Sequence, residues 1–195
     1  VSYWTMDNVS GNTLIDETGN NNGTIYGATQ VDGRVGKALS FDGVDDYVGV
    51  ADSSTLEPTD ITMSMWIKPD SWLIGTIANS LIAKRTSNVS GFCLIYYLGA
   101  LHWDFGGNQE GANPTRWNTG YSPALNTWTH ITLTRNSTGR YLYVNGVLNN
   151  STTYSGRPDL VPSISNLKIG MDTVSAQYYF DGSIDDVMIF NRALS

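Results

Sequence analysis

Short runs in which apolar and polar residues alternate recur along the whole chain, and Gly, Asn, Asp and Pro separate them. The runs are rich in Ile, Val, Thr, Tyr and Trp, which suit a pleated and half-buried surface. No stretch repeats apolar residues over three turns at the i, i+3, i+4, i+7 spacing of an amphipathic helix. Many short strands joined by turns predict an all-β fold, either a sandwich or a barrel.

The alternation also predicts which side chains point into the core. In the run ITMSMWIKP, one face is apolar and consists of Ile61, Met63, Met65 and Ile67. The other face consists of Thr62, Ser64, Trp66 and Lys68. The run WTHITLTR repeats this division, with Ile131 and Leu133 on the apolar face and His130 on the other. We expect the apolar faces to meet between two sheets and the mixed faces to form an outer surface.

Two segments carry turn signals between strand-like runs. Asn145-Gly146 separates two apolar runs, and Asn-Gly is the preferred pair for a type I′ hairpin turn, in which both residues have positive φ. FDGVDDYVGV, residues 41–50, reads as strand, Asp-Gly turn and strand. We expect its first aspartate, Asp42, to form the turn. Asp45 or Asp46 is expected to help hold the ends of the chain rather than to act in catalysis.

Length, charge and cysteine content narrow the class of protein. The chain has 195 residues and shows no internal repeat or linker, which predicts one domain over residues 1–195. A net charge of −7 argues against nucleic acid or an anionic membrane as partner, and permits divalent cations and neutral ligands. No apolar run approaches the length of a membrane helix. The single cysteine, Cys93, excludes an intrachain disulfide and reads as a buried small hydrophobe.

The surface composition predicts an extracellular protein, either secreted or attached to a cell surface. Lysines are few, and Asn, Ser, Thr and Gly are abundant. The abrupt ends at Val1 and Ser195 suggest a domain excised from a longer secreted protein. The Asn-X-Ser/Thr sequons are either N-glycosylation sites or chance occurrences in a chain rich in Asn, Ser and Thr. The sequons begin at Asn8, Asn22, Asn88, Asn136, Asn149 and Asn150.

Several segments match a known pattern in the same order along the chain. They are GKALSFDGVDDYVGV, ITMSMWIKP, WTHITLTR, YLYVNGVL, LKIG and FDGSIDDVMIFNRALS. The set resembles the laminin G-like, or concanavalin A-like, lectin/glucanase superfamily, in particular its bacterial and archaeal LamG-like jelly-roll type. The resemblance covers nearly the whole chain and implies an antiparallel two-sheet β-sandwich, a jelly roll of concanavalin A-like type. It does not specify function, because the superfamily includes lectins, carbohydrate-binding modules, adhesion modules and hydrolases.

The chain lacks the residue patterns of glycan-cleaving enzymes on this fold. Such enzymes usually carry carboxylates that alternate along one strand, and retaining glycosidases need two carboxyl groups about 5 Å apart. The three glutamates, Glu17, Glu57 and Glu110, lie in no alternating acidic strand. The two histidines, His102 and His130, accompany no Gly-X-Ser-X-Gly elbow. The sequence therefore predicts a protein that is not an enzyme.

A polar turn near the N-terminus offers candidate calcium ligands. DETGNNNG places oxygen-bearing side chains at every second position, which can wrap a hard cation, although an ordinary Asn- and Gly-rich turn is the alternative. The family resemblance implies one structural Ca²⁺ that joins this turn to the last strand, where two adjacent aspartates need a cation, an arginine such as Arg192, or backbone donors. The predicted ligands are Asp16, Asn20 and Asp186, with Asp185, Asp45 and Asp7 in reserve.

Aromatic residues concentrate between positions 96 and 128 and predict a sugar site. Sugar sites combine aromatic ring faces with a few amide, hydroxyl and guanidinium groups. The stretch 106–126 is the longest without a strand pattern, and a long loop in a compact β-domain is often functional. The predicted ligand-binding residues are Trp117, Trp103, Tyr121, Arg116, His102, Asn113 and Tyr97. The alternative is that Trp117 folds back onto the edge of the sandwich.

Other aromatic residues are expected to be structural. Trp66 and Trp128 occupy positions where the resembled family usually has Trp, and we expect both to pack. Trp4 in the first strand and Tyr143 beside the Asn-Gly turn are also expected to pack.

Non-catalytic binding of a polysaccharide or glycan is the leading function, in an accessory module of a secreted enzyme or surface protein. Such a module is expected to be monomeric, tethered to other domains, and without nucleic acid or an inserted membrane segment as partner. The runner-up is a structural or adhesion module of a cell-surface or envelope protein. A glycoside hydrolase or lyase is the third reading.

Overall fold

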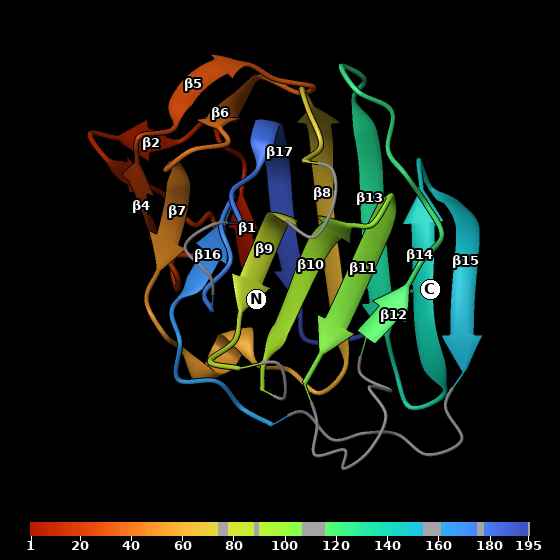
Figure 1. The fold of residues 1–195 in the computed structure, drawn as a ribbon. Helices are drawn as coiled ribbons and strands as arrows, with labels where there is room; N and C mark the ends of the chain where they lie inside the picture. The colour runs from red at the N-terminus through yellow and green to blue at the C-terminus, as the bar shows by residue number, and fades with distance from the viewer. Residues whose placement is uncertain (74–77, 88–89, 107–115, 154–160, 175–177, 195) are drawn as a thin grey trace.

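The computed structural model is an antiparallel β-sandwich of two stacked sheets (Figure 1). It describes residues 1–73, 78–87, 90–106, 116–153, 161–174 and 178–194. Within these ranges the only helix is the short 3-10 helix η1 (Ser54–Leu56), so none could cross a membrane. The all-β, two-sheet prediction is therefore confirmed.

Sheet A lies at the back of the sandwich in Figure 1 and contains strands from both ends of the chain. Strand β1 (Ser2–Trp4) joins it by pairing with β17. The other strands, in spatial order, are β15 (Val147–Thr153), β14 (Gly139–Val144), β13 (Thr129–Arg135), β8 (Ile61–Pro69), β17 (Asp181–Phe190), β6 (Lys37–Asp42) and β5 (Thr29–Asp32).

Sheet B lies at the front in Figure 1, and its neighbouring strands are also antiparallel. Its strands, in spatial order, are β12 (Arg116–Asn118), β11 (Ala100–Phe105), β10 (Phe92–Tyr97), β9 (Asn79–Lys84), β16 (Leu167–Ile169), β7 (Tyr47–Val50), β4 (Gly23–Tyr26), β3 (Thr13–Leu14) and β2 (Val9–Ser10).

The core fills the space between the sheets, as the alternation predicts. On β8 and β13, Met65 pairs with Ile131 and Met63 pairs with Leu133, and all four side chains are buried in the main hydrophobic cluster. Burying a side chain of this size stabilises the fold by roughly 1.5–3 kcal/mol. The other face of β8, which includes Trp66, points away from this cluster. The face assignment for these strands is therefore confirmed, and it places Trp66 on the outside of sheet A.

The two predicted turns have different outcomes. Asn145 and Gly146 have φ values of 50° and 79° and connect β14 to β15, so the predicted hairpin turn is confirmed. The segment FDGVDDYV connects β6 in sheet A to β7 in sheet B, so it forms a corner between the sheets and no hairpin. Asp42 Oδ1 accepts hydrogen bonds from Val44 N and Asp45 N, which confirms that Asp42 forms this turn.

Candidate functional site

An open pocket of about 560 Å³ lies on the outer face of sheet A. This volume is within the range of roughly 300–1,000 Å³ that is typical of ligand pockets. Trp66, Trp128 and His130 are half-buried, so part of each ring reaches the pocket. The residues that line it are Arg34, Trp66, Trp128, His130, Asn145 and Gly146.

Strand register brings the central rings of the pocket together. His130 on β13 pairs with Trp66 on β8, and residues opposite each other in register point to the same face of a sheet. The centroids of the two rings are 5.0 Å apart. The Oγ of Ser64, two residues before Trp66, is 2.8 Å from His130 Nε2 and orients the imidazole through a hydrogen bond. Burial lowers the pKa of His130, and the nearby Asp186 carboxylate partly opposes this shift.

The hairpin turn between β14 and β15 supplies an amide to the pocket. Asn145 N donates to His130 O over 2.9 Å, and His130 N donates to Asn145 Oδ1 over the same distance. These two bonds hold the asparagine beside the imidazole. Because Oδ1 already accepts a backbone N–H, the Nδ2 group is the part of Asn145 that can serve a ligand as a donor.

Arg34 reaches the pocket from the turn between β5 and β6. Its guanidinium carbon is 5.0 Å from the centroid of the Trp66 ring. Arg34 N and Val35 N donate to Asp185 Oδ2 over 2.8 and 3.0 Å, so a buried carboxylate of β17 holds this turn. Burial raises the pKa of Asp185 to about 6, and its Oδ1 has no hydrogen-bond partner among the described residues.

Lys68 adds a second cation next to Trp128, one of the residues that line the pocket. It follows Trp66 by two residues on β8 and therefore points to the same face. Its Nζ is 5.8 Å from the centroid of the Trp128 ring. The pocket thus combines two indole rings with a nearby cation on each, one imidazole and one amide.

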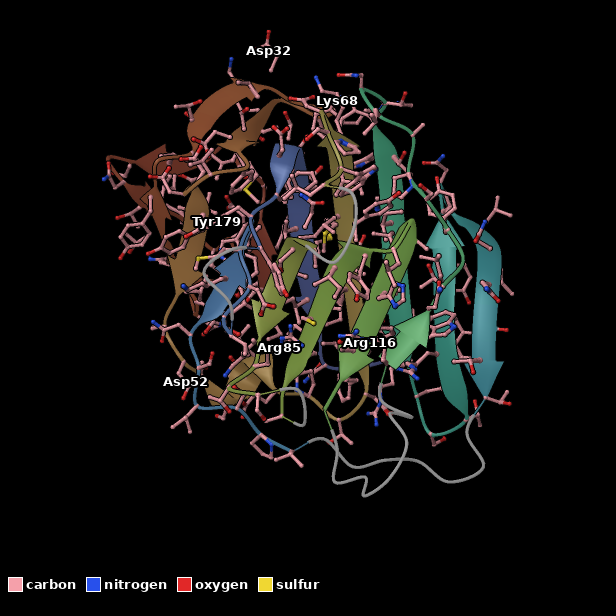
Figure 2. The ribbon with its side chains drawn as sticks, in the orientation of Figure 1. Asp32, Asp52, Lys68, Arg85, Arg116 and Tyr179 are labelled. Atoms are coloured by element: carbon pink, nitrogen blue, oxygen red, sulfur yellow. The ribbon has the colours of Figure 1, made fainter. Side chains whose placement is uncertain are left out.

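Three of the seven predicted ligand-binding residues meet elsewhere, on the outer face of sheet B. The ring centroids of Tyr97 and His102 are 5.7 Å apart, and the Arg116 guanidinium carbon is 5.5 Å from the Tyr97 centroid. Figure 2 shows Arg116 beside the strands of this sheet, where its guanidinium donates three hydrogen bonds to the Asp104 carboxylate. His102 is only 6% exposed, and burial, followed by the Arg116 charge, lowers its pKa.

The tryptophans of the predicted site lie in the core. Trp103 on β11 pairs with Trp117 on β12, and both side chains belong to the hydrophobic cluster between the sheets. Trp103 is 0% exposed and Trp117 is 7% exposed, so neither offers a ring face to a ligand. The stacking role predicted for them is corrected to packing, because both occupy inward positions of their strands. Tyr121 is half-buried against the same core, and Asn113 lies outside the described residues.

The sequence predicts packing roles for Trp66 and Trp128, and the structure places both half-buried at the pocket wall. The alternation on β8 places Trp66 on the same outward face as Ser64 and Lys68, but the sequence could not show which outward residues other elements leave uncovered. A tryptophan on a mixed, outward face is available to a ligand unless another element covers it. The structure leaves both rings half-exposed at the pocket wall.

The first-choice calcium ligands have hydrogen-bond partners within the protein. The Asp16 carboxylate accepts four hydrogen bonds, from Tyr3 N, Thr18 N, Thr18 Oγ1 and Asn21 N, which fills its lone-pair positions. Hydrogen bonds to the ionised carboxylate lower the pKa of Asp16, although its burial acts in the opposite direction. Asn20 donates its Nδ2 to Thr18. These hydrogen bonds hold the N-terminal turn together.

The other predicted ligands also have protein partners. Asp186 lies at a β-bulge with φ of 50° and accepts a hydrogen bond of 2.6 Å from the Tyr3 hydroxyl. Asp185 Oδ2 serves the Arg34 turn, and Asp7 Oδ1 accepts from Lys37 N over 2.6 Å. Of the predicted set, Asp45 alone belongs to a close acidic group among the described residues.

That acidic group sits in the corner between β6 and β7. Asp42, Asp45 and Asp46 have carboxylate oxygens that all lie within 4.8 Å of one another. Asp46 is 9% exposed, and burial, together with the charges of the other two aspartates, raises its pKa. Asp46 Oδ2 accepts from Asp42 N over 3.1 Å. This hydrogen bond lies within the corner and does not join it to the chain ends.

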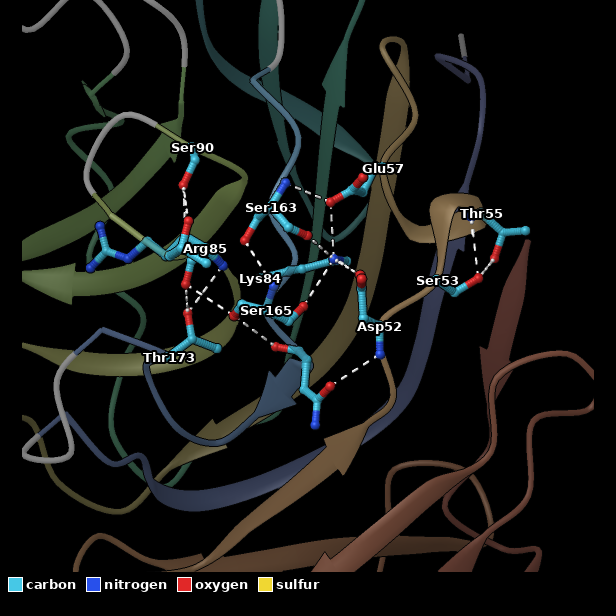
Figure 3. A network of polar contacts seen from close by, with 12 residues as sticks. Asp52, Ser53, Thr55, Glu57, Lys84, Arg85, Ser90, Ser163, Ser165 and Thr173 are labelled. Atoms are coloured by element: carbon cyan, nitrogen blue, oxygen red, sulfur yellow. Dashed lines mark hydrogen bonds and ion pairs between the residues drawn. The ribbon is translucent and has the colours of Figure 1, made fainter.

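A buried ion network holds the end of sheet B (Figure 3). The Lys84 side chain is 0% exposed, and its Nζ is 2.5 Å from Asp52 Oδ1 and 3.0 Å from Glu57 Oε1. It also donates to the carbonyl oxygens of Ser163 and Ser165 over 2.5 and 2.9 Å. Because its ammonium group has four acceptors, Lys84 has a structural role and joins three segments of the chain.

An antiparallel sandwich of two sheets places the chain among jelly-roll-type β-proteins, and one sheet carries an aromatic pocket on its outer face. The chain belongs to the concanavalin A-like lectin/glucanases superfamily, whose family model matches residues 42–195. This confirms the family resemblance read from the ordered motifs.

Solved structures share the fold over the whole chain. Domain 4 of AbnA, an extracellular GH43 arabinanase from Geobacillus stearothermophilus, was solved in complex with arabinotriose. It matches with a TM-score of 0.73 and 19% identity, covering 100% of this chain and 93% of that chain. The binding domain of botulinum neurotoxin DC in complex with SialylT matches with a TM-score of 0.72 and 17% identity, covering 100% of this chain and 48% of that chain.

A human protein is also similar in sequence. Adhesion G-protein coupled receptor D1 of Homo sapiens is 27% identical over 198 residues, covering 99% of this chain. The chain spans 22% of the length of that receptor. The similarity therefore concerns one region of a much longer protein.

Proposed function

We propose that this domain is a non-catalytic carbohydrate-binding module whose ligand occupies the pocket of Trp66 and Trp128. The observation that carries the proposal is the pocket itself, where two half-exposed indole rings adjoin Arg34, His130 and Asn145. Indole faces stack on the apolar faces of sugar rings, while guanidinium, imidazole and amide groups hydrogen-bond sugar hydroxyls.

Two comparisons support a carbohydrate ligand. One similar structure was solved with arabinotriose and another with SialylT. Single open sites of this kind bind weakly, so the module would gain affinity from tethering to other domains or to a repeated ligand. We place the domain in an extracellular protein, in line with the extracellular arabinanase that shares its fold.

Alanine substitution of the pocket tryptophans tests the proposal. We expect Trp66→Ala and Trp128→Ala to weaken binding to any polysaccharide that the wild-type domain retains by at least about tenfold, or about 1.4 kcal/mol. Tyr26→Ala is the matched control, because Tyr26 is an exposed aromatic residue on β4 of the other sheet. Affinity electrophoresis over a polysaccharide panel, with a thermal melt of each variant, separates lost binding from lost folding. Binding that survives both pocket substitutions contradicts the proposal.

An adhesion module is the second candidate, and the similarity to an adhesion receptor favours it. In that case the domain binds a protein surface and retains no polysaccharide. A well-folded domain that fails the whole panel while Trp66→Ala abolishes attachment to cells would support adhesion over glycan binding. Release of soluble sugar from the panel on long incubation would instead indicate an enzyme.

A further inference from the structure

We propose that the pocket selects an acidic glycan, whose sugars carry carboxylate or sulfate groups, through Arg34 and Lys68. This inference rests on the proposed function and names the ligand class of the same site. Its basis is the placement of two cations at one aromatic pocket in a strongly acidic protein.

Charge is distributed unevenly between this pocket and the rest of the molecule. The chain has 11 Lys and Arg against 18 Asp and Glu, and a net charge of −7. Several of its cations are held in ion pairs, with Lys84 on Asp52 and Glu57, Arg85 on Asp172, Arg116 on Asp104, and Lys37 on Asp32. Over the described ranges, neither Arg34 nor Lys68 has an ion-pair partner. Both lie at the rings of one pocket.

No carboxylate is among the described residues that line the pocket. The two aspartates of β17 near the pocket, Asp185 opposite Trp66 in register and Asp186 near His130, accept hydrogen bonds from protein groups. Asp185 accepts from the backbone of the Arg34 turn, and Asp186 accepts from the Tyr3 hydroxyl. An anionic group in the pocket would therefore face cations and neutral donors at first contact.

The position of the Arg34 guanidinium suits a planar anionic group. A guanidinium that stacks on an aromatic ring uses its face and leaves its N–H edge for acceptors, and that edge matches the two oxygens of a carboxylate or sulfate. The Arg34 guanidinium carbon lies over the Trp66 ring, 5.0 Å from its centroid, and the bonds from its turn to Asp185 fix where the side chain begins. Lys68 adds a compact charge near Trp128. A sugar ring beside Trp128 would thus lie near Lys68, with Arg34 at the other indole ring of the pocket.

Paired probes that differ in charge alone test the inference. We would measure binding to polygalacturonate and to its methyl-esterified form, and to chondroitin sulfate and its chemically desulfated form. The variants are Arg34→Gln, Lys68→Gln and the double substitution, with Arg192→Gln as control. Arg192 is exposed on the segment after β17, and its loss changes the net charge by the same amount as either single variant.

The expected result is at least about tenfold tighter binding to one charged probe than to its neutralised form. The double variant should lose this preference, whereas Arg192→Gln should keep it within about twofold. Preference for polygalacturonate would identify the carboxylate, and preference for the sulfated chain would identify the sulfate. Equal binding to both members of each pair, with no effect of the double variant, overturns the inference.

Different experimental results would contradict the proposed function and the inference about charge. If Trp66→Ala abolishes binding to a neutral polysaccharide that the double charge variant still binds, the pocket is a sugar site without charge selection. If the wild-type domain binds no probe, charged or neutral, both proposals fall together.

Discussion

Asp185 and Arg34 are 151 residues apart in the chain, yet the Asp185 carboxylate accepts a hydrogen bond of 2.8 Å from Arg34 N. The same oxygen accepts from Val35 N. The last strand of the domain thus positions the turn that presents a cation to the pocket of Trp66. We expect Asp185→Ala to lower the free energy of unfolding by about 1–3 kcal/mol, because it leaves two backbone N–H groups without an acceptor.

The matched control for this substitution is Asp185→Asn, which keeps a side-chain oxygen for the two N–H groups. Urea denaturation should place Asp185→Asn nearer to wild type than Asp185→Ala. Equal stability of Asp185→Ala and wild type would show that this carboxylate does not hold the turn.

Trp103 is expected to be a stability residue. Its side chain is 0% exposed between the sheets, so Trp103→Ala should cost roughly 3–5 kcal/mol through lost burial and the cavity it leaves. Trp128→Ala, on the half-exposed pocket wall, should move the denaturation midpoint far less. Equilibrium unfolding in guanidinium chloride measures both. A Trp103→Ala variant as stable as Trp128→Ala would contradict the buried position.

Lys84→Met should destabilise the domain by about 3 kcal/mol, because removing one partner of a buried ion pair leaves the others uncompensated. Glu57 is largely buried beside Lys84, and two carbonyl oxygens would also lose their donor. Lys37→Met is the control, since Lys37 pairs with Asp32 on the open surface and should shift the midpoint little. Thermal unfolding at neutral pH distinguishes the two. Similar small shifts for both would mean that the Lys84 network adds no net stability.

Histidine protonation should destabilise the domain in mild acid. Burial lowers the pKa of His102 below its ordinary value of 6.5, so at a pH below that value the unfolded chain binds more protons than the folded domain. The stability that neutral His102 contributes is present above pH 6.5 and is lost as the pH falls toward its folded pKa. Carboxyls with raised pKa, such as Asp46, act in the opposite direction.

The His102 contribution is isolated by comparing wild type with His102→Gln. We would measure unfolding free energy between pH 7.5 and pH 5. The difference between the two proteins should change across this range in the direction that favours the variant at low pH. A constant difference would show that His102 titrates alike in the folded and unfolded chain.

Calcium is expected to raise the melting temperature through Asp42, Asp45 and Asp46. Their oxygens lie within 4.8 Å of one another, and a divalent cation would relieve the repulsion among three carboxylates. Calcium at ten times its dissociation constant would add about 1.4 kcal/mol of stability. The shift should disappear with chelator and weaken in Asp45→Asn, but persist in Asp7→Asn, an exposed aspartate elsewhere. If neither calcium nor chelator changes the melting temperature, the calcium prediction is wrong.

The sequence predicted the core more successfully than the site. The two-residue period of ITMSMWIKP identified Met63 and Met65 as buried and placed Trp66 on the opposite face, because side chains alternate strictly along a strand. The same rule could not say which outward residues would stay uncovered. Trp117 was misjudged because the stretch around it showed no strand pattern, whereas in the structure β12 pairs with β11 and Trp117 faces inward. Trp103 shares the inward face of β11 with Leu101 and Phe105, which the two-residue period of that strand predicts.

What the sequence by itself determined is therefore local: the strand-like runs, the Asn145-Gly146 turn, the Asp42 turn and the family that their order resembles. Each depends on residues that are close together in the chain. Only the tertiary structure decided which distant segments meet. It packed a turn from the first quarter of the chain against strands that follow it in sequence. This placed Arg34 over Trp66, whose ring also lies beside His130. It also gave Asp16 and Asp186 donors from the same residue of β1, the Tyr3 backbone N–H and the Tyr3 hydroxyl. The pairing of β1 with β17 spans nearly the whole chain, and no local pattern encodes it.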